Sequence, residues 1–393
     1  RPADRKLSGI RVRTLEFPRL TPGSWLRGEF AATADAWIRD HIGFRGYLIC
    51  LNRQIRFSLF GQVEPAPLRK RALVVGREPV LFENILLVDA LRPPQITREQ
   101  MDDFVARLAK TQQLLREQGI AFLVLLAPNK AFLYTDDLPA WARHHVTETH
   151  SDHMTFLDSL RRHGVSHLNS MEVFRTLGPE YHDMIPPHGI HWSNRGAWVA
   201  WQHAIPEINR QGVLPEIPVP ETVDLVYAKP TSMNDELRSQ LNLFRAPHAK
   251  PIASAYPVAG PLPPGTESML NVLIVGDSFG FTLADALSRS RLCKQIDYWF
   301  YMKNAKTAHP PSFDSRLQRT ISGISGVSGA GAMPPKDENG RRMLAGKNLV
   351  VFVITTFNID KSSWGFDRLV NRLYGDPDDP ESAYEEIEVN LGD

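Results

Sequence analysis

The sequence contains few cysteines, almost no net charge and no long apolar run. Its two cysteines, Cys50 and Cys293, are too few for a disulfide-rich scaffold or a multi-cysteine zinc site, and they permit either one bridge or two free thiols. Lys and Arg number 45 and Asp and Glu 44, so the net charge of +1 argues against a nucleic-acid partner. No segment approaches the ~18 apolar residues that a membrane-spanning helix needs.

The rest of the composition is that of an ordinary globular protein. Apolar residues make up 42% and charged residues 23%, which excludes wholesale disorder and a fibrous fold. The length of 393 residues fits two to three domains, or one large α/β domain with appendages. The 30 prolines outnumber the 26 glycines and indicate long irregular connections. Because the sequence begins at Arg1, we expect a mature or trimmed product, which leaves open that a signal or anchor segment has been removed.

The first 66 residues predict an extended arm followed by helices. Apolar residues recur at helical spacing from residue 29 to about residue 60, and the segment 41–46 divides this stretch into two helices. Residues 71–82 then have the pattern of a β-hairpin. We expect the main domain to occupy residues 67–375 and an acidic, solvated tail to occupy residues 376–393.

The main domain alternates helices with buried strands. A helix capped by Thr97 ends at Gly119 and leads into the continuous apolar run 120–128, as expected for a parallel strand that is buried on both faces. Further helices are predicted at 151–163 and 194–209, and further strands at 165–169, 271–276, 296–302 and 348–356. This alternation is typical of a three-layer α/β/α fold with a mostly parallel sheet. A Pro-rich insertion at 213–267 and a Gly-rich loop at 321–340 interrupt it.

The strongest local signal for chemistry is the segment 272–287, in which an apolar strand runs through Gly-Asp-Ser-Phe into a helix. Ser278 is therefore expected at the carboxyl end of a strand, where open α/β sheets build their sites. The N–H groups at the helix start suit a developing oxyanion. The simpler interpretation is that Ser278 only caps the helix.

A serine nucleophile needs a base, and the segment 188–198 offers one. His191 precedes Trp192 and lies in a polar loop just before a helix, from which a base can reach the end of a neighbouring strand. The alternative is an ordinary loop histidine.

The two segments together resemble the alginate O-acetyltransferase family, which comprises SGNH-hydrolase-like proteins that acetylate bacterial exopolysaccharides. Three further segments agree in the same order: 34–61, 74–82 and 125–139. The resemblance covers about residues 30–300. It implies a three-layer α/β/α sandwich of the SGNH type, with the base before the nucleophile in the chain and hence a permuted connection. It also implies a periplasmic protein, with attachment to the membrane through a removed N-terminal segment left open.

The sequence departs from the family at one position. The family's usual motif is Asp-x-His-Trp, and Gly189 stands here where the Asp is expected. A base without its orienting carboxylate can lose about 10⁴-fold in rate. Three alternatives follow: a carboxylate such as Asp277 or Asp183 replaces it, a Ser–His dyad suffices, or the protein is a non-catalytic relative.

The mechanism that the resemblance implies is two-step acyl transfer without a cofactor. We expect His191 as base, Ser278 as nucleophile and Asp277 as the acid, with acetyl groups delivered by a membrane-bound O-acyltransferase and accepted by a polysaccharide. The expected oxyanion donors are the N–H of Phe279 and the side-chain amide of Asn129 or Asn304. The residues expected to contact substrate are Trp192, Arg195, Lys130 and Asn129. The near-zero net charge permits a neutral glycan such as cellulose as well as alginate.

Three other interpretations remain. Four histidines within residues 143–154 have spacings that can bind zinc, but neither HExxH nor cysteine ligands accompany them, so a solvated loop is expected and no metal is predicted: His144, His145, His150 and His153. The same fold can serve an acetyl esterase or deacetylase, which uses water as acceptor. It can also serve a non-catalytic glycan-binding subunit of an acetylation complex.

Overall fold

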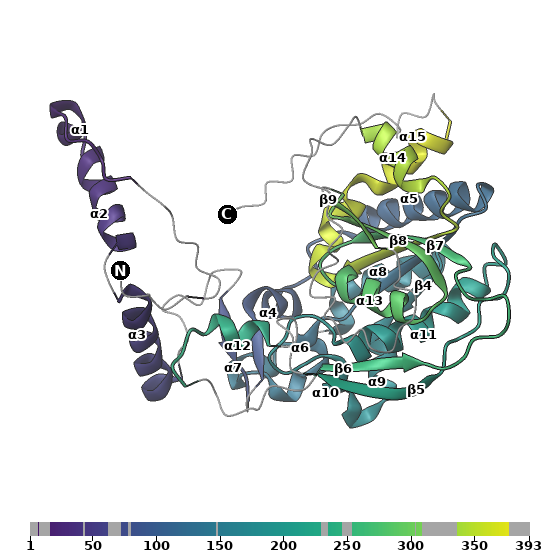
Figure 1. The fold of residues 1–393 in the computed structure, drawn as a ribbon, viewed down its shortest axis with the longest axis horizontal. Helices are drawn as coiled ribbons and strands as arrows, with labels where there is room; N and C mark the ends of the chain where they lie inside the picture. Colours follow the sequence, from purple (N-terminus) through teal and green to yellow (C-terminus); the bar gives the residue numbers. More distant parts are fainter. Residues whose placement is uncertain are drawn as a thin grey trace.

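A computed structural model describes Leu7 and residues 16–41, 44–61, 72–77, 80–146, 148–228, 235–245, 254–302, 304–308 and 336–376. Its main part is a six-stranded sheet between two layers of helices, and an arm of three helices extends from this part (Figure 1). The predicted Gly-rich loop lies outside the described residues up to residue 335, and so does the acidic tail after Asp376.

The central sheet has the strand order β4-β3-β10-β7-β8-β9. The first five of these strands are mutually parallel, and β9 runs antiparallel to β8. Their bounds are β3 (Ala121–Ala127), β4 (His167–Asn169), β7 (Leu270–Gly276), β8 (Cys293–Phe300), β9 (Asn304–Ala308) and β10 (Leu349–Thr355).

Both faces of the sheet are apolar because β3 and β10 are buried along their whole length and successive residues point to opposite faces. Leu123 and Leu125 belong to the core on one face, and Phe122 and Val124 to the core on the other. The helices of the first face are α4 (Asn84–Leu91), α6 (Lys130–Leu133), α9 (Ser170–Thr176), α11 (Asn194–Asn209) and α13 (Gly280–Arg289). The helices of the second face are α5 (Arg98–Glu117), α8 (Asp152–Arg162), α14 (Lys336–Leu344) and α15 (Phe366–Tyr374).

Most predicted elements are confirmed. Thr97 caps α5 in a capping box, α11 has the predicted bounds 194–209, and the hairpin consists of β1 (Leu73–Val75) and β2 (Leu81–Glu83). The remaining short helices are α7 (Ala140–Arg143), α10 (Tyr181–Met184) and the 3₁₀ helices Thr135–Asp137, Glu148–His150, Gly178–Glu180 and Thr356–Gly365.

Cys50 and Cys293 are both buried free thiols.

The arm consists of α1 (Pro22–Leu26), α2 (Glu29–His41) and α3 (Arg45–Phe60). In the Pro-rich insertion, β5 (Thr222–Ala228) pairs antiparallel with β6 (Ser254–Ala259), and the short helix α12 (Glu236–Gln240) lies between them in the sequence. Arg53 of α3 donates to the carbonyl of Gln240 at 2.9 Å, so the arm contacts α12. Among the described helices, none is both long enough and apolar enough to cross a membrane.

Candidate active site

The candidate nucleophile lies in a tight turn between β7 and α13. β7 ends at Gly276 and α13 begins at Gly280, so Ser278 is at the carboxyl end of the sheet as predicted. Both glycines are required by close approach. A Cβ at Gly276 would lie 2.3 Å from the carbonyl oxygen of Val353 on β10, and one at Gly280 would lie 2.7 Å from the ring of Tyr298.

His191 contacts this serine directly. Its Nε2 lies 2.7 Å from the Oγ of Ser278, across 87 residues of sequence. His191 is 8% exposed, and its ring centroid lies 4.7 Å from that of Phe279. The structure therefore brings together the two residues that the sequence analysis proposed as nucleophile and base.

The carboxylate beside His191 comes from Glu236, which the sequence analysis did not consider. Its Oε1 lies 2.9 Å from His191 Nδ1 and also accepts hydrogen bonds from the backbone N–H groups of Ile190 at 2.7 Å and His191 at 3.4 Å. The neighbouring residues on α12 contact the same loop. Asp235 lies 3.4 Å from the Nδ1 of His188, and the N–H of Leu237 donates to the carbonyl of His188 at 2.9 Å.

This arrangement determines the tautomer of the imidazole. A carboxylate can only accept hydrogen bonds, so Nδ1 of His191 carries the proton that Glu236 accepts. Nε2 then has a free lone pair, which accepts the hydroxyl proton of Ser278. These are the relations between acid, base and nucleophile in a serine-hydrolase triad.

The prediction of Asp277 as the acid is corrected by its contacts. Its Oδ2 accepts hydrogen bonds from the N–H of Thr355 at 2.8 Å, the hydroxyl of Thr355 at 2.7 Å and the amide of Asn358 at 2.9 Å. Its Oδ1 accepts from the N–H of Phe279 at 3.2 Å. Burial raises the pKa of Asp277, and these hydrogen bonds oppose the rise. Asp277 thus joins the serine turn to the end of β10.

Asp183, the other acid considered, is also engaged elsewhere. Its Oδ2 pairs with Arg195 at 2.8 Å, and Arg195 also pairs with Glu180 at 2.7 Å. The side chain of Arg195 is 25% exposed, so this predicted substrate contact retains some access to solvent.

Two of the predicted oxyanion donors, the N–H of Phe279 and the amide of Asn129, already have other acceptors. The N–H of Phe279 already donates to Asp277, and the amide of Asn129 donates to the carbonyl of Leu86 at 3.2 Å and to Asp89 at 2.9 Å. Asn304 is the first residue of β9, where its backbone pairs with Phe300. The backbone N–H of Ser278, in contrast, has no acceptor in the described part of the chain, which leaves it available to an oxyanion.

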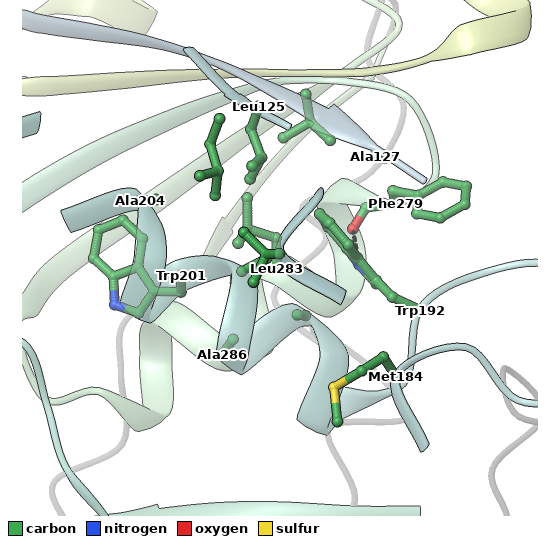
Figure 2. Packing of buried hydrophobic residues seen from close by; sticks show 14 of the residues in the cluster. Leu125, Ala127, Met184, Trp192, Trp201, Ala204, Phe279, Leu283 and Ala286 are labelled. Atoms are coloured by element: carbon green, nitrogen blue, oxygen red, sulfur yellow. Dashed lines mark hydrogen bonds between the residues drawn. The ribbon is translucent and has the colours of Figure 1, made fainter. Parts of the chain in front are cut away.

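The other three predicted substrate contacts are buried. Trp192 is 0% exposed and packs edge-on against Phe279, and its indole N–H donates to the carbonyl of Phe279 at 3.1 Å (Figure 2). Lys130 is also 0% exposed, and its ammonium contacts backbone carbonyls. Asn129 is equally buried and caps α6.

The histidine cluster does not converge in the structure. His153 is buried in α8, where burial lowers its pKa to about 3, whereas His144, His145 and His150 lie near the surface. Among the described residues, no group of three or more His, Cys, Asp or Glu side chains could hold a metal ion.

Comparison with known proteins places the chain in a family. The sequence profile of the family described as "SGNH hydrolase-like domain, acetyltransferase AlgX" matches residues 75–282, which is more than half of the chain. This match confirms the resemblance and the SGNH-like α/β fold class that were predicted. No curated protein matches the chain.

Several solved structures are similar over most of the chain. The O-acetyltransferase domain of Pseudomonas putida AlgJ is 18% identical, with a TM-score of 0.44, over 73% of this chain and 91% of that one. Pseudomonas aeruginosa AlgX is 14% identical, with a TM-score of 0.46, over 78% of this chain and 67% of that one. Bacillus cereus PatB1 is 14% identical, with a TM-score of 0.47, over 75% and 99%.

Proposed function

The chain belongs to the SGNH hydrolase-like acetyltransferase family of AlgX, and from that premise we propose that it transfers acetyl groups through an acetyl-serine to hydroxyls of a bacterial exopolysaccharide. The observation that carries the proposal is the hydrogen-bonded series Glu236–His191–Ser278, with contacts of 2.9 and 2.7 Å. It supports a catalytic protein over a non-catalytic glycan-binding relative. Gly189 has no carboxylate to orient His191, and Glu236 supplies one instead.

In the first half-reaction, His191 Nε2 accepts the proton of Ser278 while its Oγ attacks the carbonyl carbon of the acetyl donor. The N–H of Ser278 donates to the oxyanion, and Glu236 stabilises the imidazolium. The imidazolium then protonates the leaving group as it departs, and acetyl-Ser278 remains. In the second half-reaction, a sugar hydroxyl loses its proton to His191 and attacks the acetyl carbon, and the imidazolium returns the proton to the Oγ of Ser278 as its bond to the acetyl group breaks.

The family resemblance supports a proposal about the acetyl donor and the compartment. We propose that a membrane-bound O-acyltransferase supplies the acetyl groups and that the chain acts in the periplasm. Acetylation of the polysaccharide in cells that lack either protein tests the first part of this proposal. Retained acetylation without the membrane-bound enzyme would contradict it.

Transfer to a sugar and hydrolysis by water differ only in which hydroxyl attacks acetyl-Ser278. We propose to incubate the protein with p-nitrophenyl acetate and either cello-oligosaccharides or oligomannuronate, and to follow acetylated sugar by mass spectrometry and free acetate by titration. Acetylated sugar that is absent with Ser278→Ala supports the transferase. If acetate is released and neither sugar is acetylated, the protein is an esterase.

A further inference from the structure

The loop that carries His191 contains a segment, residues 185–189, that forms no regular helix or strand. Pro186 and Pro187 have no backbone N–H, so the segment can form few hydrogen bonds of its own. Its carbonyls nevertheless need donors, because an unpaired buried carbonyl is costly. Each of its five successive carbonyls accepts a hydrogen bond from a residue outside the segment.

The ammonium group of Lys130 contacts three of these five carbonyls. Its Nζ lies 2.9 Å from the carbonyl oxygen of Pro186, 2.5 Å from that of Pro187 and 3.0 Å from that of Gly189. It also lies 2.9 Å from the carbonyl oxygen of Leu81 on β2. The hydroxyl of Tyr134 donates to the carbonyl of Ile185, and the N–H of Leu237 to that of His188.

The aromatic rings and carbonyl oxygens around the Nζ of Lys130 favour a positive charge there. Its ammonium lies 5.5 Å from the ring centroid of Phe82 and 5.2 Å from that of Tyr134, within the range of cation–π attraction. Burial lowers the pKa of Lys130 well below its ordinary value, and the charges of Glu236 and Asp137 offset only part of this lowering. All four neighbours of Nζ are acceptors, which suits the three N–H groups of an ammonium, while the lone pair of a neutral amine would face a carbonyl oxygen.

The loop is thus held from two sides. Lys130 holds its carbonyl groups up to Gly189, and Glu236 holds the N–H groups of Ile190 and His191. The N–H of Gly189 also donates to the carbonyl of Pro186 at 3.0 Å, so the loop turns tightly around the ammonium.

We propose that Lys130 is a positioning residue, whose ammonium organises the carbonyls of Pro186, Pro187 and Gly189 and so holds the imidazole of His191 between Glu236 and Ser278. The expected effect of Lys130 on kcat rests on the proposed function. The structural consequence of the proposal, the orientation of His191, does not depend on any substrate.

The test variant is Lys130→Met in the full chain, which keeps the length of the side chain and removes its charge and donors. The matched control is Lys347→Met, which removes a second buried lysine, paired with Asp297 just before the amino end of β10. Turnover of p-nitrophenyl acetate should fall about 100-fold in kcat for Lys130→Met with little change in KM, because a catalytic group displaced by about 1 Å can cost that much. Lys347→Met should keep the parent kcat.

A second readout is the downfield proton resonance of the His191 Nδ1–H that Glu236 accepts, assigned by its absence in His191→Gln. We expect this resonance to be lost or shifted in Lys130→Met and retained in Lys347→Met, both recorded well below their melting temperatures. If Lys130→Met does not fold, Lys130→Gln removes the charge while keeping a polar group in the same place, and it should shift the same resonance.

An unchanged resonance in a folded Lys130→Met or Lys130→Gln variant would overturn the proposal, as would a parent-like kcat for Lys130→Met. Absence of acetyl turnover in the parent together with a resonance that is lost in Lys130→Met would contradict the proposed function and leave the positioning role supported.

Discussion

Glu236→Gln separates the two roles that the carboxylate has in the site. The Oε1 of Glu236 accepts from Ile190 N–H at 2.7 Å as well as from His191 Nδ1 at 2.9 Å. In the Gln variant the amide oxygen must remain at this position, because an amide NH₂ group would face these donors. The imidazole therefore keeps its tautomer, and only the negative charge is lost.

The cost of that charge can be estimated from the geometry. Opposite unit charges about 4 Å apart interact by ~4 kcal/mol at an effective dielectric constant of about 20. The glutamine amide dipole keeps part of this attraction to the imidazolium. Solvent also screens the carboxylate, because the side chain of Glu236 is 18% exposed. We therefore expect the substitution to remove about half of the attraction. About 2 kcal/mol corresponds to a fall of about 30-fold in kcat. Glu236→Ala removes the acceptor as well, and loss of tautomer control costs ~10⁴-fold in serine-hydrolase triads.

The assay is steady-state hydrolysis of p-nitrophenyl acetate by the parent and the two variants, with the exposed Glu172→Gln as control. We expect kcat to fall about 30-fold for Gln and about 10⁴-fold for Ala, and to be unchanged in the control. Equal losses for Gln and Ala would refute the tautomer argument. Parent-like turnover in Glu236→Ala would refute the role of Glu236 altogether.

Three further predictions follow from the contacts of single residues. Asp277→Asn should lower the free energy of unfolding by about 2 kcal/mol, measured in urea, because its amide cannot satisfy all the donors around it. A large loss of kcat without loss of stability would instead make Asp277 the catalytic acid. Gly189→Asp should not raise kcat, since His191 Nδ1 is already bonded to Glu236, and a tenfold gain would contradict this. His153 has a pKa of about 3 in the folded protein against 6.5 ordinarily, so the unfolded chain takes up a proton that the folded one does not, and stability falls as the pH drops from 6.5 towards 3. Between pH 7 and pH 5 the parent should lose about 2 kcal/mol more than His153→Phe in urea titrations, and equal losses would show that His153 does not contribute.

The sequence predicts the sheet and its helices well because their patterns are long and strongly apolar. β3 and β10 are buried from end to end, and α11 begins after a serine cap and keeps its apolar residues at helical spacing. The pairing of His191 with Ser278 could be proposed from the family resemblance, although 87 residues separate them.

The acid and the substrate contacts could not be predicted in this way. Glu236 lies on a five-residue helix in a Pro-rich stretch without periodicity, and only the folded chain brings it to His191. The sequence predicts Lys130 and Trp192 as substrate contacts, because exposed cationic and aromatic side chains often contact sugars. Their burial depends on the carbonyls that satisfy Lys130 and on the carbonyl of Phe279 that accepts from Trp192, which no local pattern reveals.

The most direct test of the proposed mechanism is the mass of the protein during turnover. The parent is mixed with p-nitrophenyl acetate, quenched in acid within one turnover, digested and mapped by mass spectrometry. The proposed mechanism predicts that Ser278 gains the mass of one acetyl group, that Ser278→Ala gains none, and that an acceptor sugar removes the label from the parent. Turnover of the donor with Ser278 unmodified at every quench time, or acetyl label of equal amount in Ser278→Ala, would contradict an acetyl-serine intermediate.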